Sequence, residues 1–226
     1  MKCISFVAKC LYGRFRKAYT TTSTLTYLLV PPTAVRGLLG AILGVDRKDL
    51  YTETECLDIA IEVLNDINKD TQSFNLSIMK SETGNTYSFP SNIEFLRDIE
   101  YRIYLKSENT VLLSKIKEVL TSGEYFYTPY LGSSEHVCKL FFENEFVAEK
   151  LACDYYEVSS SFDKKTALDI EITDSSKIYS DNIPTRINES REYIEYKKLL
   201  FPVEGSTVRL KSDNLYKVGD KYVEFI

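Results

Sequence analysis

Basic side chains are concentrated at the start of the sequence, where they are suited to bind an anion. Residues 1–48 contain eight lysines and arginines and one acidic residue, a net charge of +7, whereas residues 49–70 carry −6. Salt screens charges beyond about 8 Å, so a local excess can attract a polyanion although the whole chain carries −5. The same charges would also suit a solvated surface, and the charge pattern alone does not separate the two interpretations.

Three of these basic residues, Arg14, Arg16 and Lys17, lie in a connection that precedes a predicted helix. The connection covers residues 11–30 and is first basic and then rich in hydroxyl side chains. Loops longer than about 15 residues without regular structure are uncommon in compact domains and tend to be functional. This connection is therefore the first part of a candidate anion-binding site.

The helix that follows, VPPTAVRGLLGAILG at residues 30–44, contains three of the nine glycines in the chain. Each glycine inside a helix costs roughly 1 kcal/mol relative to alanine, so three of them need a reason. On a helical wheel the large apolar side chains share one face, and Gly37, Gly40 and Gly44 share the opposite face. The outward face is thus stripped of side chains, which indicates that something approaches it closely.

Two explanations for this glycine face stay open: a packed protein element and a phosphate backbone. A second transmembrane helix would also use small residues, but the apolar run is shorter than the ~20 residues that a span needs. Thr33 is expected as the N-cap of a helix whose free N–H groups attract anions. Arg36 lies in the first turn, where a cation opposes the helix dipole unless an anion is bound. Both details favour phosphate.

Metal, cofactor and membrane chemistry are not expected. The chain has one histidine, and its cysteines are widely spread without a CxxC pair. Because zinc sites need closely paired ligands, we expect reduced thiols, no metal and no cofactor. No segment is long and apolar enough for a membrane span, and no cleavage site follows a hydrophobic N-terminal region, so we expect a cytoplasmic protein.

Alternation and helical periodicity predict an α+β fold. Besides the helix at 30–44, the sequence predicts strands at 2–10, 99–107, 125–132 and 136–146, and a helix at 111–123 that ends at a glycine. Residues 57–80 suit a strand or a helix, and their β-branched residues favour a strand. Turn chemistry around Gly84–Asn85, within 81–92, indicates the tip of a protruding hairpin. The order strand, helix, strands, strand, helix, strand is that of a ferredoxin-like, RRM-type sandwich.

The character of the sequence changes at about residue 151. Residues 1–150 are expected to form the ferredoxin-like domain, and residues 151–226 a small C-terminal β-rich module. Within the module, residues 163–198 are charged and loop-like, and short strands are expected near 199–210 and 214–226.

Three segments carry a resemblance to a known family: FRKAYTTTSTLTYLLVPPTAVRGLLGAILG, NIEFLRDIEYRIYL at 92–105 and YLGSSEHVCKL at 130–140. They resemble the Cas5 family of the RAMP superfamily, subunits of type I CRISPR effector (Cascade) complexes, and are most similar to the type I-B variety. The pattern PPTAxxGLLGAxLG is specific because it fixes prolines, a threonine and several glycines in one order. The resemblance covers the N-terminal two-thirds of the chain, and the tail only loosely.

The resemblance implies a RAMP, RNA-binding fold with a β-hairpin thumb around residues 72–92. It implies a subunit that clasps the 5′ handle of the crRNA and caps one end of the backbone filament in antiviral defence. The implied partners are the crRNA, the backbone (Cas7-type) subunit, the large (Cas8-type) subunit and, through the assembled complex, target DNA. The implied RNA-binding residues are Arg14, Arg16, Lys17, Thr33, Arg36, Gly37 and Gly40.

One branch of the family, found in type I-C systems, cuts repeat RNA without metal by means of tyrosine, lysine and histidine. Such cleavage needs a base near the 2′-hydroxyl and an acid at the leaving oxygen. Here His136 is the only histidine, and Lys139 with Tyr125, Tyr127 and Tyr130 would supply the other residue types. A lone histidine at the start of a strand is more often structural. We therefore predict a noncatalytic RNA-binding subunit, with a metal-independent endoribonuclease that uses His136 and a protein-interaction module as alternatives.

Overall fold

The first predicted strand lies inside the main sheet of the computed structural model. The structure describes residues 1–20, 24–79, 86–172, 177–190 and 192–226. β1 (Lys2–Gly13) pairs antiparallel with β4 (Thr86–Ser107) on one side and with β5 (Lys139–Lys150) on the other. β2 (Asp58–Val63) pairs with the other edge of β4, which gives the order β2-β4-β1-β5. β1 is buried on both faces, because helices cover one face and later strands cover the other.

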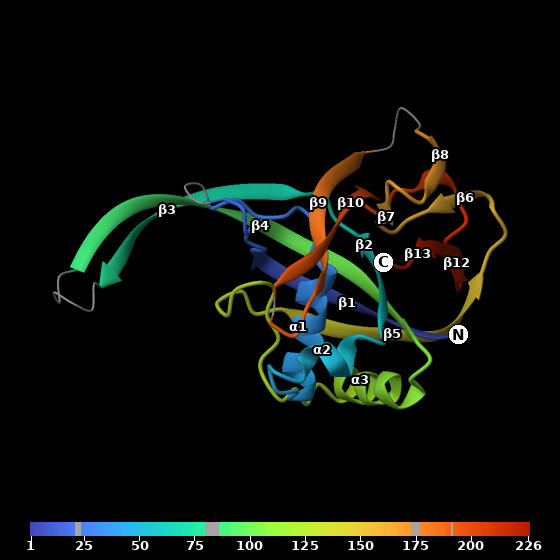
Figure 1. Ribbon diagram of the computed structural model, residues 1–226, viewed down its shortest axis with the longest axis horizontal. Helices are drawn as coiled ribbons and strands as arrows, with labels where there is room; N and C mark the ends of the chain where they lie inside the picture. The colour runs from blue at the N-terminus through green and yellow to red at the C-terminus, as the bar shows by residue number, and fades with distance from the viewer. Residues whose placement is uncertain (21–23, 80–85, 173–176, 191) are drawn as a thin grey trace.

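Helices α1 (Pro32–Leu43) and α3 (Thr110–Ser122) lie on the same side of this sheet, and the short α2 (Leu50–Thr54) follows α1 (Figure 1). The Asn109 side chain caps α3 by accepting a hydrogen bond from a backbone N–H, and the helix ends at Gly123 in the left-handed region. The predicted helix at 111–123 is therefore confirmed. The order of elements up to β5 is the predicted one apart from two differences: the structure adds the short α2 and has no strand at 125–132.

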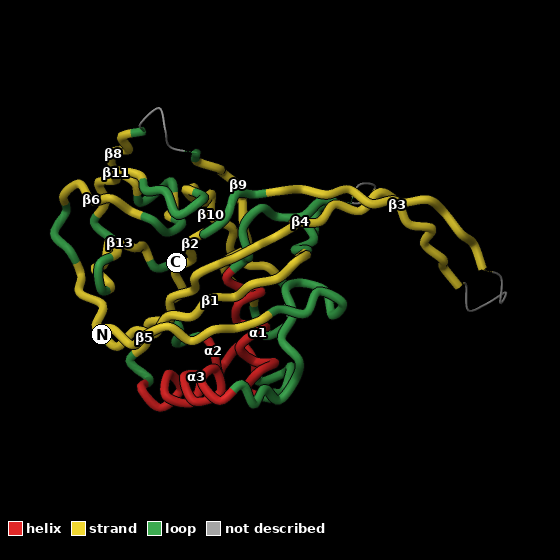
Figure 2. The backbone as a smooth tube through the Cα atoms, turned by 180° about the vertical axis from the view of Figure 1, so that it is seen from behind, coloured by secondary structure: helices red, strands yellow, loops and turns green. Residues whose placement is uncertain are grey.

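A long two-stranded ribbon extends from the body of the molecule (Figures 1 and 2). The ribbon consists of β3 (Asn68–Met79) and the first half of β4, which pair along the whole length of β3. The segment 57–80, for which we favoured a strand, thus holds two strands, β2 and β3. The turn predicted around Gly84–Asn85 lies outside the described residues.

The strands after residue 151 extend the main sheet and build a second sheet. Beyond β5 the main sheet continues in the order β12-β13-β6-β11-β8, and the second sheet has the order β7-β10-β9. The bounds are β6 (Asp154–Val158), β7 (Phe162–Asp163), β8 (Ala167–Glu171), β9 (Ile178–Ile187), β10 (Tyr193–Pro202), β11 (Val208–Ser212), β12 (Leu215–Val218) and β13 (Lys221–Glu224). Side chains of the second sheet, including Leu199 and Phe201, join the hydrophobic core beneath α1.

The prediction that residues 163–198 are loop-like is wrong, because β9 and half of β10 lie there. Asp181, Ile183 and Thr185 are buried at alternate positions of β9. Two of these three buried residues are polar, so the alternation along β9 does not register as hydrophobic. Strands expected within 214–226 are confirmed by β12 and β13.

Candidate nucleic-acid interface

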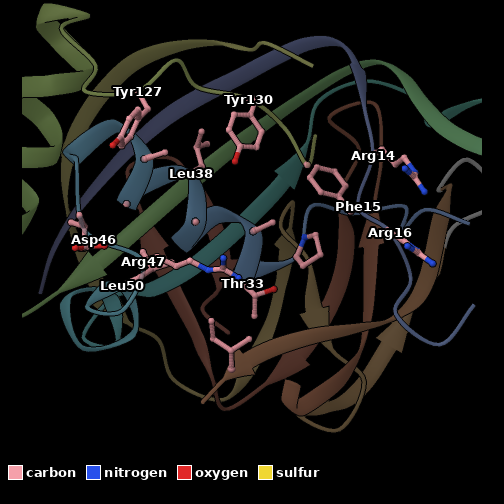
Figure 3. Close-up of a pocket in the computed structure, with 18 of the residues that line it drawn as sticks. Arg14, Phe15, Arg16, Thr33, Leu38, Asp46, Arg47, Leu50, Tyr127 and Tyr130 are labelled. Carbon is pink, nitrogen blue, oxygen red and sulfur yellow. The ribbon is translucent and has the colours of Figure 1, made fainter. Parts of the chain in front are cut away.

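A groove of about 780 Å³ runs along the glycine-bearing side of α1 (Figure 3). Segments far apart in sequence line it: the connection before α1, α1 itself, the turn that leads into α2, and the segment between α3 and β5. Of the seven predicted RNA-binding residues, Lys17 and Arg36 lie outside the groove. The five that line it are Arg14, Arg16, Thr33, Gly37 and Gly40.

The N-terminus of α1 is fixed by proline rather than by threonine. The carbonyl of Pro31 accepts the N–H groups of Ala34 and Val35 at 2.8 and 3.1 Å, and no side chain in the described ranges caps the helix. The prediction of Thr33 as N-cap is therefore wrong. Pro31 and Pro32 already set the extended entry into the first turn, which leaves Thr33 inside that turn, lining the groove.

Arg36 joins α1 to the chain that leaves α2. Its half-buried guanidinium donates to the carbonyl oxygens of Thr54 and Leu57, and burial lowers its pKa below the ordinary value. These two carbonyls offset the cation in the first turn of α1, so its placement there is explained within the protein. The position of Arg36 in the first turn therefore gives no independent support for a phosphate, and its contact with RNA stays a prediction.

Lys17 is also held within the protein. Its ammonium lies 2.8 Å from a carboxylate oxygen of Asp181 and 5.3 Å from the ring centroid of Tyr27. The side chains of Lys17 and Asp181 are only 16% and 7% exposed. Lys17 thus ties the connection to β9, a contact across 164 residues that the sequence pattern does not reveal.

Gly37 and Gly40 of α1 and its C-cap, Gly44, meet different surroundings. A Cβ at Gly37 would have no atom within 4 Å, so this position is open. A Cβ at Gly40 would lie 2.3 Å from Leu50 Cδ1, and one at Gly44 would lie 2.6 Å from the ring of Phe126. Packing against Leu50 accounts for Gly40, and the left-handed φ of +71° together with the ring of Phe126 accounts for Gly44. The expectation of an entirely open glycine face holds only at Gly37.

Arginines bring positive charge to the groove. Arg14 and Arg16 lie near one end of it, beside Phe15, and Arg47 lies toward the other end (Figure 3). Burial and the neighbouring Arg16 together lower the pKa of Arg14. Within the ranges that the structure describes, none of the three guanidinium groups forms an ion pair. Sequence reasoning did not single out Arg47, and its only signal was its place in the basic first 48 residues.

The prediction of a strand at 125–132 is wrong, because this segment packs against the end of α1 instead of pairing in a sheet. The N–H groups of Phe126 and Tyr127 donate to the carbonyls of Ile42 and Ala41 at 3.0 and 3.1 Å. The helix itself leaves the Ile42 carbonyl without a partner, whereas the Ala41 carbonyl also accepts the Gly44 N–H at 3.3 Å. The segment thereby forms the aromatic side of the groove.

Gly132 joins this aromatic segment to the basic connection. Its φ of +90° lies in the left-handed region, and a Cβ there would lie 1.7 Å from the carbonyl oxygen of Arg14. The N–H of Arg14 donates to the carbonyl of Leu131 at 3.2 Å. Only glycine permits this close approach of the two backbones, which positions Arg14 and Tyr130 on the same groove.

His136 lies outside the groove, in an aromatic cluster at the base of the ribbon. Its ring centroid is 5.3 Å from that of Phe95 and 6.4 Å from that of Tyr12. Its Nε2 is buried without a hydrogen-bond partner among the described residues, and burial lowers the pKa of the imidazole. Tyr127 and Tyr130 line the groove instead. The candidate ribonuclease residues are therefore divided between two places.

The five cysteines are free thiols: Cys3, Cys10, Cys56, Cys138 and Cys153. In the described part of the chain, no group of three histidine, cysteine or carboxylate side chains is arranged to hold a metal ion. None of the helices described reaches the length and apolarity needed to cross a membrane.

The fold is shared with CRISPR-associated proteins. It is similar to a CRISPR protein from Archaeoglobus fulgidus, with a TM-score of 0.58 over 99% of this chain and 98% of that chain at 11% identity. It is also similar to a chain of a CRISPR RNA-guided surveillance complex, with a TM-score of 0.55 over 91% of both chains at 13% identity. No curated protein sequence matches the chain.

The sequence itself shows the family. The profile described as CRISPR-associated protein (Cas_Cas5) matches residues 11–189, so the chain belongs to the Cas5 family of CRISPR-associated proteins. The predicted family and the predicted α+β fold class are confirmed.

Proposed function

We propose that the chain is the noncatalytic crRNA-binding subunit of a type I CRISPR surveillance (Cascade) complex, in which it clasps the 5′ handle and caps the backbone filament in antiviral defence. The observation that carries this proposal is the groove along α1 in a Cas5-family chain, lined by three arginines without ion-pair partners among the described residues. Phosphate oxygens suit such guanidinium groups. A similar chain belongs to an RNA-guided complex, which adds support.

Other parts of the fold support the same proposal. The connectivity β1-α1-β2-β4-α3-β5 with the order β2-β4-β1-β5 supports a ferredoxin-like palm, and the β3–β4 ribbon would act as the thumb. The partners we propose are the backbone (Cas7-type) subunit, the large (Cas8-type) subunit and, through the complex, target DNA. The PPTAxxGLLGAxLG motif favours the type I-B variety, and we place the complex in the cytoplasm.

The test removes positive charge inside and outside the groove of the assembled complex. Arg16→Gln with Arg47→Gln should weaken crRNA binding and reduce the slope of log affinity against log salt by about 0.7 per lost contact on single-stranded RNA. Lys115→Gln with Lys150→Gln is the matched control, because both lysines are exposed and lie outside the groove. An unchanged slope in the arginine variant would contradict the proposal.

A second test concerns cleavage. Metal-free cleavage needs a positioned acid as well as a base. Burial lowers the pKa of His136, so the imidazole carries its acidic proton less often at neutral pH and is less available as the acid. We therefore expect no discrete product when the purified protein is incubated with labelled repeat RNA in EDTA. A single cut that disappears in His136→Ala would overturn the noncatalytic proposal in favour of the endoribonuclease alternative.

A further inference from the structure

Exposed aromatic rings line one side of the groove, and phosphate binding alone does not explain them. Phe126 and Tyr127 are 67% and 59% exposed, with their ring centroids 4.8 Å apart and nearly perpendicular. Tyr130 lies further along the same side, toward Phe15 (Figure 3). Large rings that stay in solvent beside a groove indicate a ligand with planar or apolar groups.

The backbone holds two of these rings in place before any ligand binds. The N–H groups of Phe126 and Tyr127 are bonded to the last carbonyls of α1, and the ring of Phe126 lies directly over Gly44. A Cβ at Gly44 would meet that ring, so glycine allows the close contact. Because the segment is fixed by a helix end, binding to these rings would cost little ordering of the chain.

The arginines near the aromatic rings indicate which kind of planar ligand the groove suits. Figure 3 shows Tyr127 and Tyr130 on one side of α1, Arg47 beside Asp46 on the other, and Arg14 and Arg16 at the end. Within the described ranges, three of the four charged residues that line the groove are therefore arginines. A ligand that contacts both the aromatic rings and the arginines must carry planar faces as well as anionic groups. Single-stranded nucleic acid has this pattern, because its bases are free to stack on aromatic rings while its phosphates meet arginine. A duplex would keep its base faces covered.

We propose that Phe126, Tyr127 and Tyr130 stack unpaired bases of a single-stranded RNA whose phosphates contact the groove arginines. This inference rests on the proposed function, since it assigns a subsite within the same groove. The open position at Gly37 leaves room for the strand to pass along α1. Because every base has a stacking face, these rings hold bases without reading their identity.

The experiment separates bases from phosphates with two probes. One is a single-stranded RNA of about 12 nucleotides, within the range of known single-strand sites, and the other is an abasic ribose-phosphate strand of equal charge. The purified full chain should bind the RNA more tightly than the abasic strand. Phe126→Ala with Tyr127→Ala should reduce that preference by about 5- to 150-fold per stacked base and leave the affinity for the abasic strand unchanged.

Control variants distinguish stacking from a general loss of structure. Phe141 on β5 is 50% exposed and lies outside the groove, so Phe141→Ala should leave the preference for RNA unchanged. Tyr127→Trp should retain the preference, whereas Tyr127→Leu, which keeps an apolar side chain without an aromatic face, should reduce it. Circular dichroism identifies any variant that is not folded. Among folded variants, Tyr127→Leu shows whether an aromatic face, rather than any apolar side chain, is required.

The outcomes also separate this inference from the proposed function. If the aromatic variants keep the full preference for RNA while Arg16→Gln with Arg47→Gln weakens the binding of both probes, stacking is wrong and the proposed function stands. If neither set of variants weakens binding, the proposed function fails as well. If the aromatic variants bind RNA normally but no longer assemble with partner subunits, the rings dock a protein and the inference is overturned.

Discussion

Two charged regions lie on opposite faces of the main sheet and differ in how their charges are satisfied. On the α1 side, the groove arginines have no ion-pair partner in the described ranges. On the other side, the Glu62 carboxylate is 1% exposed and accepts hydrogen bonds from Arg102, Tyr104 and Lys221, each at 3.0 Å. Arg102 also makes a bidentate contact with Glu143. We call these five residues the polar joint.

The polar joint adds side-chain contacts between strands of the main sheet, not all of which pair directly with one another. It spans β2, β4, β5 and β13, and so links the first part of the chain to its last strand. The bidentate contact with Glu143 raises the pKa of Arg102, and burial raises that of Tyr104. Charges whose partners are complete within the chain serve the fold, whereas charges left without partners at the groove are suited to a ligand.

The largest effect is expected from breaking the polar joint. Glu62→Ala leaves Arg102 and Lys221 without their buried partner, so it should lower the free energy of unfolding by about 3–5 kcal/mol. Urea denaturation measures this, with Glu118→Ala on the exposed side of α3 as the control. The folded variant should keep its RNA affinity. A loss below about 1 kcal/mol would show that the joint is not a structural element.

Glu224 offers a contrast to Glu62, because it is a buried carboxylate without an ion-pair partner in the described ranges. Glu224 is 1% exposed and accepts hydrogen bonds from the Asp163 N–H and the Thr166 hydroxyl, and burial raises its pKa to about 7. The folded state then binds this proton more tightly than the unfolded state, whose pKa is near the ordinary 4.5. Its stabilising contribution is complete below pH 4.5 and is lost as the pH rises through 7.

Between those limits the contribution of Glu224 to the free energy of unfolding should change by about 3 kcal/mol. Glu224→Gln keeps the acceptor oxygen and removes the titration. Urea denaturation at several pH values between 4.5 and 7.5 should therefore show a flatter profile for the variant than for the unchanged protein. Parallel profiles would show that Glu224 does not titrate in this range. Asp163 and Lys197 face the same group and stay unchanged in both proteins.

The smallest effect on stability is expected at the glycine face, and it separates the open from the packed position. Gly37→Leu should raise the free energy of unfolding by up to about 1 kcal/mol through helix propensity, yet weaken RNA binding because the side chain fills the groove. Gly40→Leu should lower stability by about 1 kcal/mol or more, because Leu50 occupies its space. Thermal unfolding and RNA titration of both variants measure this. Equal RNA affinity in Gly37→Leu and the unchanged protein would exclude the strand from this side of α1.

Local pattern was sufficient for the elements nearest the core. β1 and α3 were predictable because each has a continuous apolar pattern with the right period, and α3 also has a glycine at its end. β9 and β10 were not, because polar residues such as Asp181 are buried there by partners distant in sequence. Their burial depends on the tertiary structure and leaves no period-2 signal.

The groove was only partly predictable for the same reason. The sequence pointed to Arg14, Arg16 and Gly37, which share one short stretch of the chain. It gave the wrong environment for Lys17 and Arg36, because the partners of these cations are a carboxylate on β9 and carbonyls after α2. Arg47 and Phe126 line the groove because of how the backbone packs at the end of α1. Neither their residue types nor their spacing in the sequence predicts this packing.

The β3–β4 ribbon has a consequence for the free subunit. Strands at the edge of a sheet normally carry lysine, other charges or proline that prevent pairing with a second chain. Residues 71–79 of β3 and 86–93 of β4 contain no charged side chain, and Pro90 alone interrupts the sequence of potential backbone donors. A ribbon of two strands is also marginal without further packing. The subunit outside its complex is thus the form most exposed to strand-to-strand aggregation, and co-expression with its partners should improve its solubility.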